Sequence, residues 1–575
     1  MFSTKWQTSR REYGIIVEKD VKIPMPDGTL IDADIFRPDS DKNFPAIFGY
    51  SPYPKAPQTS PIQPEAISAS IQRLPGKEKA TGYLEAGDPN FFVRRGYAQI
   101  VANARGTGKS TGKYPFVASP EPEDGAEVIE WIARQPWCDG NVGMFGISYF
   151  GWIQLYIAEL APPALKCLFA PWAASDLYRD SVYHGGILGH GFWRALAPAF
   201  HHCKAENQTL NMLGEEGFKK AVAKALEDED IAEVPELVEI LKNPGDAAKL
   251  FIQDFILNPL DGPYWKKRQV QYDKIKIPAY IGGCWGHVGL HLPAAFRSWE
   301  KLDVPKKMII GPQAFVDRPF YQLGYQSLRW FDYWLKGMEN GIMDEPNVRV
   351  FQMGTGEWKE SKDWPLPETR WTPFYLHENG LLWEHEFAPH EGCDSFDDSP
   401  WYRGFLEYTS PPMVEDTDII GPIVLNLYAS TNDTDILWFV SLRELDKDGN
   451  ERVLTRGWLR GSHREVDKAK SKPWYPYHPH DKSVLLEPEK IYEFNIPLVP
   501  TGNVFKQGSR IKLKIAGKDD IPANPLEGIA SGHIWRQNPS RITIYHDEEN
   551  PSHLLLPITR GNIMETYISG GKPYI

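Results

Sequence analysis

Residues 142–151 read Val142-Gly143-Met144-Phe145-Gly146-Ile147-Ser148-Tyr149-Phe150-Gly151, and this is the most informative stretch of the chain. An apolar, strand-like run leads into Gly146 and Ser148, and a helix-like run begins at Trp152. A serine on such a strand-to-helix turn has a strained backbone, which lifts its hydroxyl above a sheet and turns the next N–H toward a developing oxyanion. The pattern is weak by itself, because Phe150 stands where the usual motif has glycine and an ordinary structural turn would fit as well. Whether Ser148 is a nucleophile or part of a structural turn must therefore be inferred from the sequence around it.

Short apolar runs similar to the one before Ser148 recur along the first part of the chain. They lie at residues 45–50, 97–102, 142–147, 167–171, 279–283 and 307–311. Several of them precede helix-like segments, of which Glu123–Gln135 is the clearest. Uninterrupted apolar strands that alternate with helices indicate a parallel sheet covered on both faces. We therefore predict an α/β core over roughly residues 15–170 and 270–340.

Two other kinds of sequence accompany this core. Residues 175–270 show helical patterning with many aromatic and histidine residues, which predicts a helical cap whose side chains form the roof of a pocket or simply pack the cap onto the core. Further along, alternating strands such as Val424–Tyr428 and Ile511–Ile515 are separated by turn residues, including Asp446–Gly449, and predict an all-β sandwich of the jelly-roll type. The predicted domains are the core in two parts (1–174 and 271–345), the cap (175–270) and the jelly roll (346–575).

Length and composition restrict the number of domains, the kinds of partner and the cellular compartment that we expect for the protein. A chain of 575 residues exceeds the roughly 250–300 that one core usually supports. The net charge of −13, with no Lys/Arg-rich stripe, argues against nucleic acid as a partner. No apolar run reaches the roughly 18 residues of a membrane-spanning helix, and the N-terminus has no signal-peptide pattern. The five widely spaced cysteines imply neither a zinc site nor a disulfide framework. We expect a cytoplasmic protein without membrane attachment, cofactor or metal, and its oligomeric state stays open.

Several motifs surround Ser148 in a fixed order along the chain. They are 103–112 (Asn-Ala-Arg-Gly-Thr-Gly-Lys-Ser-Thr-Gly), 123–124 (Glu-Asp), 131–140 (Trp-Ile-Ala-Arg-Gln-Pro-Trp-Cys-Asp-Gly), 146–149 (Gly-Ile-Ser-Tyr), 329–337 (Arg-Trp-Phe-Asp-Tyr-Trp-Leu-Lys-Gly), 454–457 (Leu-Thr-Arg-Gly) and 461–464 (Gly-Ser-His-Arg). Over nearly the whole chain this set resembles the cocaine esterase and X-prolyl dipeptidyl peptidase family. The resemblance implies an α/β-hydrolase core with a helical cap insertion, followed by an all-β jelly-roll C-terminal domain.

The same resemblance implies roles for three residues. Ser148 is then the nucleophile that forms an acyl-enzyme. The oxyanion hole would consist of the backbone N–H of Tyr149 and the hydroxyl of Tyr53, which lies in the matching loop Ser51-Pro52-Tyr53-Pro54-Lys55. A phenol O–H and an amide N–H that converge on one point stabilise a tetrahedral oxyanion, and loss of one such donor typically costs about 2.7–4 kcal/mol. The alternative for Tyr53 is an aromatic residue that only packs its loop.

The chain departs from the family where the partners of the nucleophile belong. Gly286 occupies the place of the family's acid and Phe315 the place of its base, while Asn103 stands where relatives usually carry Asp. A serine hydroxyl is a poor nucleophile without a base, so this difference bears directly on the chemistry. His287 and His291, in the loop that normally supplies the acid, are the candidates for a relocated base. Asp317 is a candidate for the acid that orients it, although a loop histidine more often only bonds backbone.

Three hypotheses follow from these residues. In the leading one the protein is a cofactor-free serine hydrolase, which cleaves an ester or amide of a small molecule or short peptide with Ser148, Tyr53, Tyr149 and either His287 or His291. In the second, the same oxyanion donors serve non-hydrolytic chemistry, as in a lyase, cyclase or acyl transferase. In the third, the chain is a catalytically silent relative that binds a ligand. Fold alone does not separate these hypotheses.

Overall fold

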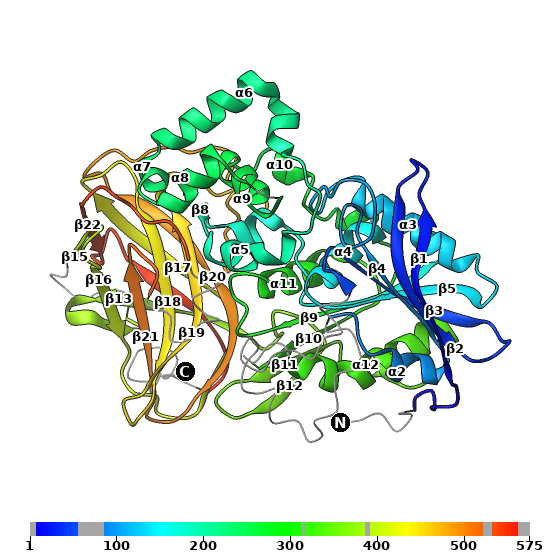
Figure 1. The fold of residues 1–575 in the computed structure, drawn as a ribbon. Coiled ribbons are helices and arrows are strands. Elements are labelled where there is room, and N and C mark those ends of the chain that lie inside the picture. Colours follow the sequence, from blue (N-terminus) through cyan, green and yellow to red (C-terminus); the bar gives the residue numbers. More distant parts are fainter. Residues whose placement is uncertain are drawn as a thin grey trace.

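The computed structural model describes residues 7–55, 85–245, 247–312, 317–385, 392–520 and 532–561. Within these ranges the chain forms a ten-stranded sheet flanked by helices, a group of helices above that sheet and a separate eleven-stranded sheet (Figure 1). None of the described helices combines the length and the apolar composition that crossing a membrane requires.

The ten-stranded sheet is mostly parallel. Its order is β1 (Ile15–Pro24), β2 (Leu30–Pro38), β4 (Ala98–Asn103), β3 (Phe44–Ser51), β5 (Cys138–Phe145), β6 (Leu165–Pro171), β9 (Ala279–Cys284), β10 (Lys306–Gly311), β11 (Val348–Gln352) and β12 (Glu357–Ser361). The strands from β4 to β11 pair in parallel, and β1, β2 and β12 are antiparallel additions at the edges. Every residue of β3, β4 and β9 is buried, as expected of strands covered on both faces. The predicted α/β core is confirmed.

Helices cover both faces of this sheet. One face packs against α3 (Glu121–Ala133), α4 (Tyr149–Ala158) and α11 (Leu292–Lys301). The other packs against α2 (Pro89–Phe92) and α12 (Asp317–Lys336). Neighbouring residues of β3 show the alternation of the two faces. Phe48 packs with the residues on the face covered by α3 and α4, and Ile47 packs with those on the face covered by α12.

Strands β11 and β12 lie after residue 345, where the sequence predicts the jelly roll to begin, yet they extend the core sheet. β11 pairs in parallel with β10 from Met308–Val348 onward, and β12 returns antiparallel to β11. The alternating burial of β11 is typical of a strand but contains no information about which sheet it joins. The core sheet therefore reaches Ser361.

The segment between β6 and β9 forms the cap. Its helices are α5 (Gly191–Leu196), α6 (Gln208–Glu227), α7 (Glu229–Ala232), α8 (Pro235–Lys242), α9 (Ala247–Leu257) and α10 (Pro263–Lys266), with a short two-stranded sheet of β7 (Tyr183–His184) and β8 (Ile187–Leu188) that the sequence pattern did not predict. Figure 1 shows these helices above the core sheet and extending to the second sheet. Arg536 from that sheet's domain donates to Asp230 of α7 at 2.9 Å, so the cap contacts both domains.

The C-terminal domain is all β. Its sheet order is β15 (Cys393–Asp398), β22 (Ser540–Tyr545), β17 (Thr417–Thr431), β20 (Tyr492–Phe505), β19 (Glu451–Arg460), β18 (Leu437–Leu445), β21 (Arg510–Ala516), β16 (Phe405–Thr409), β14 (Leu381–Trp383), β13 (Arg370–His377) and β23 (His553–Arg560). An additional β17–β23 pairing closes the sheet on itself. The turn at Asp446–Gly449 joins β18 to β19, where Asp446 Oδ1 accepts from the N–H of Asp448 at 2.9 Å. The predicted jelly-roll class is confirmed.

A buried ion pair joins two of the motifs that carry the family resemblance, 103–112 and 123–124. Arg105, in the loop after β4, donates through Nε and Nη2 to the two carboxylate oxygens of Asp124 on α3, at 2.5 and 2.6 Å. A third donor, Nη1, reaches Asp27 at 2.9 Å. Arg105 and Asp124 are 7% and 3% exposed, so the pair joins a loop to a helix inside the protein. Bidentate geometry of this kind is the strongest form of Arg–carboxylate contact.

Candidate active site

Ser148 lies at the turn between β5 and α4, as the sequence predicts. Its backbone has φ 55° and ψ −127°, a strained conformation for a residue with a side chain. Gly146 makes the turn fit, because a Cβ there would lie 2.3 Å from the Cβ of Phe150. The second glycine of the motif is displaced to Gly151, where a Cβ would lie 2.9 Å from the carbonyl oxygen of Pro171 on β6. The unusual spacing therefore still forms a tight strand-to-helix turn over residues 146–151, here called the elbow.

Tyr53 reaches the turn from the loop after β3. Burial raises the pKa of the Tyr53 phenol well above its usual value, and interaction with the Ser148 side chain opposes this shift, so the two side chains lie close together. The loop is held by Asn103, whose Nδ2 donates to the carbonyl oxygen of Tyr53 at 2.7 Å. An aspartate at residue 103 would place an acceptor opposite that carbonyl, so the departure from the family at this residue fits the loop.

Tyr149 presents its backbone to the site and its side chain to the interior. The fully buried phenol donates to both carboxylate oxygens of Glu121, at 2.8 and 2.9 Å, and accepts from the Tyr114 hydroxyl at 2.5 Å. As the first residue of α4, Tyr149 has a backbone N–H without an acceptor inside the helix. The Tyr53 and Tyr149 rings lie 6.0 Å apart between centroids, so Tyr53 and the first residue of α4 lie together at the turn that holds Ser148.

The cap covers this region with aromatic rings. Phe200 lies 5.9 Å from Tyr53 between ring centroids, and Trp193 lies 6.3 Å from Trp152 on α4. His202 also contacts the carbonyl oxygen of Pro52 through Nε2 at 2.9 Å. The aromatic residues of the cap therefore lie over the elbow as well as packing the cap onto the core.

His287 and His291 lie beside α4, in the segment between β9 and α11. The two rings stack with centroids 5.4 Å apart, and His291 Nδ1 accepts a hydrogen bond from the indole of Trp152 at 3.1 Å and also lies 3.4 Å from the carbonyl oxygen of Ala173. Desolvation lowers the pKa of His287 to about 3 and that of His291 well below its usual value. Both imidazoles are neutral at physiological pH and weakly basic.

Three further residues that the sequence analysis named around the base are Gly286, Phe315 and Asp317. Gly286 is exposed in the turn after β9, and no side chain there replaces the family's acid. Phe315 lies outside the described residues, and the side chain of Asp317 does too.

Two carboxyl groups near Ser148 were missed by the sequence analysis. Burial raises the pKa of both Glu85 and Glu121 to about 8. Glu121 accepts from the Tyr149 phenol and from the N–H of Val117 at 2.9 Å. Glu85 is joined to the elbow through its backbone, where its carbonyl oxygen accepts from the N–H of Ile147 at 3.1 Å. An isolated glutamate has no local pattern, so no signal in the sequence distinguishes Glu85 from a surface residue.

The raised pKa of Glu121 predicts a pH-dependent stability. Between about pH 4.3 and 8 the folded protein holds a proton on Glu121 that the unfolded chain has lost, so stability falls as pH rises through this window. Glu121→Gln imitates the neutral acid and should remove this contribution, on the order of a few kcal/mol. We expect melting temperatures to show a small effect of the variant at pH 5 and the largest stabilisation at pH 8. An effect of the same size at both pH values would contradict the assignment.

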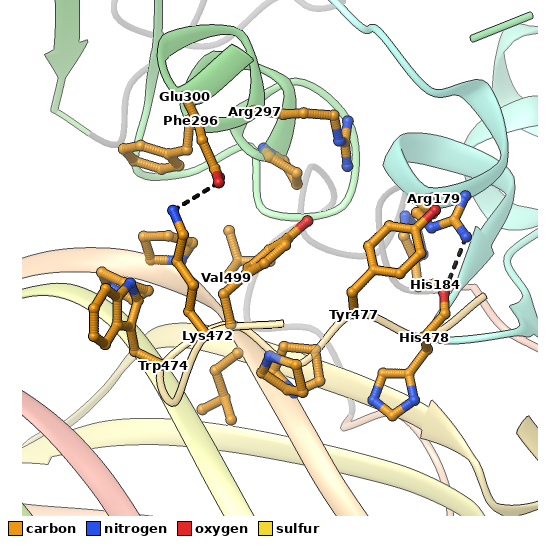
Figure 2. Close-up of a pocket in the computed structure, with 18 of the residues that line it drawn as sticks. Arg179, His184, Phe296, Arg297, Glu300, Lys472, Trp474, Tyr477, His478 and Val499 are labelled. Atoms are coloured by element: carbon orange, nitrogen blue, oxygen red, sulfur yellow. Dashed lines mark hydrogen bonds and ion pairs between the residues drawn. The ribbon is translucent and has the colours of Figure 1, made fainter. Parts of the chain in front are cut away.

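A separate cavity of about 190 Å³ lies where the cap and α11 meet the β domain. Figure 2 shows the rings of Phe296, Trp474 and Tyr477 around it, with the Lys472–Glu300 ion pair (2.7 Å) at one side. Neither Ser148 nor Tyr53 lines this cavity, whereas Val288 does. The segment that contains His287 and His291 thus has one side toward α4 and another toward the cavity.

A serine at a strained turn between a central parallel strand and a helix, beneath a helical cap, defines the class: an α/β-hydrolase. The sequence profile of X-Pro dipeptidyl-peptidase (S15 family) matches residues 27–316, and that of the X-Pro dipeptidyl-peptidase C-terminal non-catalytic domain matches residues 340–555. The chain belongs to the X-Pro dipeptidyl-peptidase (S15) family, and it is a hydrolase.

Named relatives and a solved structure align with most of the length of this chain. Cocaine esterase of Rhodococcus sp. (strain MB1 Bresler) is 26% identical, with 95% of this chain and 99% of that protein aligned. A putative Xaa-Pro dipeptidyl-peptidase of Bacillus anthracis is 24% identical, over 87% of this chain and 82% of the relative. The crystal structure of a CocE/NonD family hydrolase from Staphylococcus aureus superimposes with a TM-score of 0.81 at 28% identity, covering 95% of this chain and 94% of that one.

Proposed function

We propose that the protein is a serine hydrolase that cleaves an ester or amide through an acyl-enzyme on Ser148. The observation that carries the proposal is the contact between the Tyr53 phenol and Ser148, which stands on a strained turn after β5. In the proposed step the substrate carbonyl oxygen replaces this contact. The Tyr53 O–H and the Tyr149 N–H then stabilise the negative charge on that oxygen.

The proposed substrate is a small molecule or a short peptide with an apolar or aromatic group. Phe200 and Trp193 of the cap lie against Tyr53 and Trp152, so a ligand at Ser148 would meet aromatic surface. The relatives named above are a cocaine esterase and a putative Xaa-Pro dipeptidyl-peptidase. These names support acyl-bond cleavage in general and leave the choice between ester and peptide to experiment.

Labelling with a fluorophosphonate probe tests the proposal. We expect one covalent adduct on Ser148 by mass spectrometry, and none on Ser148→Ala. Tyr53→Phe should slow labelling by about 10²–10³-fold, because one of two oxyanion donors is lost. Tyr325→Phe is the matched control, since that phenol is exposed on α12.

The same experiment separates the other hypotheses. A loss of labelling in His287→Ala or His291→Ala would identify the relocated base predicted from the sequence. No adduct on the wild-type protein would overturn the serine hydrolase and favour non-hydrolytic chemistry or ligand binding.

A further inference from the structure

Glu85 carries a buried carboxylate oxygen in a segment whose backbone is bonded to the turn that holds Ser148. Among the described residues, its Oε2 atom is buried and makes no hydrogen bond. Its backbone is fixed to the elbow by the hydrogen bond from Ile147, the residue before Ser148. Its charge acts on the Tyr53 phenol, which lies beside Ser148. A buried polar atom without a partner is costly, so its presence calls for an explanation, and a catalytic role is one such explanation.

The segment around Glu85 is held firmly in this position. The side chain of Gln99 on β4 donates to the carbonyl oxygen of Ala86 at 2.8 Å. A Cβ on Gly87 would lie 2.7 Å from the Phe145 ring, so the segment packs directly on the end of β5. These contacts fix the backbone beside Glu85 against β4 and the end of β5.

Three other titratable groups in the part of the chain that the structure describes, Glu121, His287 and His291, are engaged in hydrogen bonds or weakly basic. Glu121 also has a raised pKa, but its carboxylate accepts from Tyr149 and Val117 and holds the first turn of α4. Nδ1 of His291 accepts from Trp152, and the low pKa of His287 makes it a weak base. A base is most effective when its pKa lies near the working pH, and the pKa of Glu85 is about 8.

We propose that Glu85 is the general base of this site and takes the place of the histidine that the family uses. The proposal deepens the proposed function and rests on Ser148 being the nucleophile. Ser148 Oγ forms a bond to the substrate carbonyl carbon while its proton moves to the Glu85 carboxylate. When the tetrahedral intermediate collapses, the bond from carbon to the leaving oxygen or nitrogen breaks and Glu85 returns the proton to that atom. Water then attacks the acyl-enzyme, gives its proton to Glu85, and Ser148 regains it on release of the acid.

The surroundings of Glu85 determine the pH dependence of this step. Tyr53, from the loop after β3, is the titratable group that the Glu85 charge acts on, and desolvation is the cause of the raised pKa of Glu85. Gln99 on β4, Phe145 on β5 and the elbow itself contribute no charge. Glu85 is therefore protonated and inactive as a base at low pH, and the fraction in the carboxylate form rises through about pH 8.

The rate of fluorophosphonate labelling of Ser148, measured from pH 6 to 10 on the full-length protein, tests the proposal. The wild-type rate should rise with a midpoint near pH 8. Glu85→Gln should lower the rate at pH 8 by about 10²–10⁴-fold and abolish the midpoint, because no group then takes the proton. Glu85→Asp keeps a carboxylate and should recover part of the rate with a displaced midpoint.

Glu159→Gln is the matched control. Glu159 follows the last residue of α4, its pKa is raised to about 7, and its Oε1 accepts from the N–H of Gln271 at 2.7 Å, a contact that a glutamine retains. This variant should label within about threefold of the wild type. Thermal melts of all variants verify folding, and Glu85→Gln should melt no lower than the wild type at pH 8, because it removes a buried charge.

Two outcomes would overturn the proposal, and each is distinct from a failure of the proposed function. The first is Ser148 labelling in Glu85→Gln at the wild-type rate with the same midpoint. The second is loss of labelling in His287→Ala or His291→Ala while Glu85→Gln retains it. Failure of the proposed function would instead appear as no labelling of Ser148 in the wild-type protein.

Discussion

Ser148→Ala is expected to lower kcat on an activated ester such as p-nitrophenyl acetate by about 10⁵–10⁶-fold. Removal of the nucleophile from a serine hydrolase typically has an effect of this size, because the residual rate comes from the oxyanion donors and from binding. KM should change little, since the serine hydroxyl contributes little to binding. Steady-state kinetics and a single-turnover burst measure the two quantities.

A suitable control is Ser40→Ala, in the turn after β2, where the hydroxyl only accepts from the N–H of Lys42 at 3.3 Å. This variant should keep the wild-type kcat. Turnover that survives in Ser148→Ala at more than a tenth of the wild-type rate would mean that the reaction does not use an acyl-enzyme on this residue.

Arg105→Ala is expected to destabilise the protein by about 3–5 kcal/mol, the largest effect on stability that we predict for a single charge. The change leaves the Asp124 carboxylate buried beside α3 without the two donors that neutralise it, and breaking a buried pair by removing one partner has a cost of this size. Burial raises the pKa of Asp124 despite its contact with Arg105, which shows how unfavourable its charge is inside the protein. Denaturant unfolding and thermal melts measure the loss.

Arg37→Ala is the control for this experiment. Arg37 Nε donates to Glu18 at 2.8 Å between the edge strands β1 and β2, with side chains 26% and 44% exposed. Exposed pairs contribute about 0–1 kcal/mol, so this variant should be nearly neutral. The double variant Arg105→Met/Asp124→Leu should regain much of the lost stability, since it removes both buried charges. Equal effects of Arg105→Ala and Arg37→Ala would contradict the importance of the buried pair.

Much of the fold could be predicted because local pattern and burial agree in the central strands. The apolar run before Ser148 became β5, and the runs at 45–50 and 97–102 became β3 and β4, which are buried on both faces. The β11–β12 hairpin shows the limit of this reasoning. Its residues have the alternation of a strand, and pairing with Met308 on β10, which the local sequence does not encode, decides which sheet it extends.

The site was predictable in part for a similar reason. Ser148 and Tyr149 belong to a continuous motif, and Tyr53 is reached through a loop that resembles the family. Their roles stay predictions, as do those of His287 and His291. Glu85 could not be found, because the property that sets it apart is the pKa of its carboxyl group, and desolvation by residues far away in the sequence causes that shift.

Local sequence patterns were enough to predict an α/β sheet with a cap before an all-β domain, and to predict Ser148 at the end of a central strand. Periodicity and turn chemistry are local properties, and they suffice for those conclusions. The groups that surround the serine could be identified only in the folded chain. The fold placed the Tyr53 phenol against Ser148, engaged the Tyr149 phenol with Glu121, bonded His291 to Trp152 and left a buried carboxylate oxygen on Glu85. The physical reason is that hydrogen bonding and desolvation depend on the three-dimensional arrangement of distant segments, which no short stretch of sequence contains.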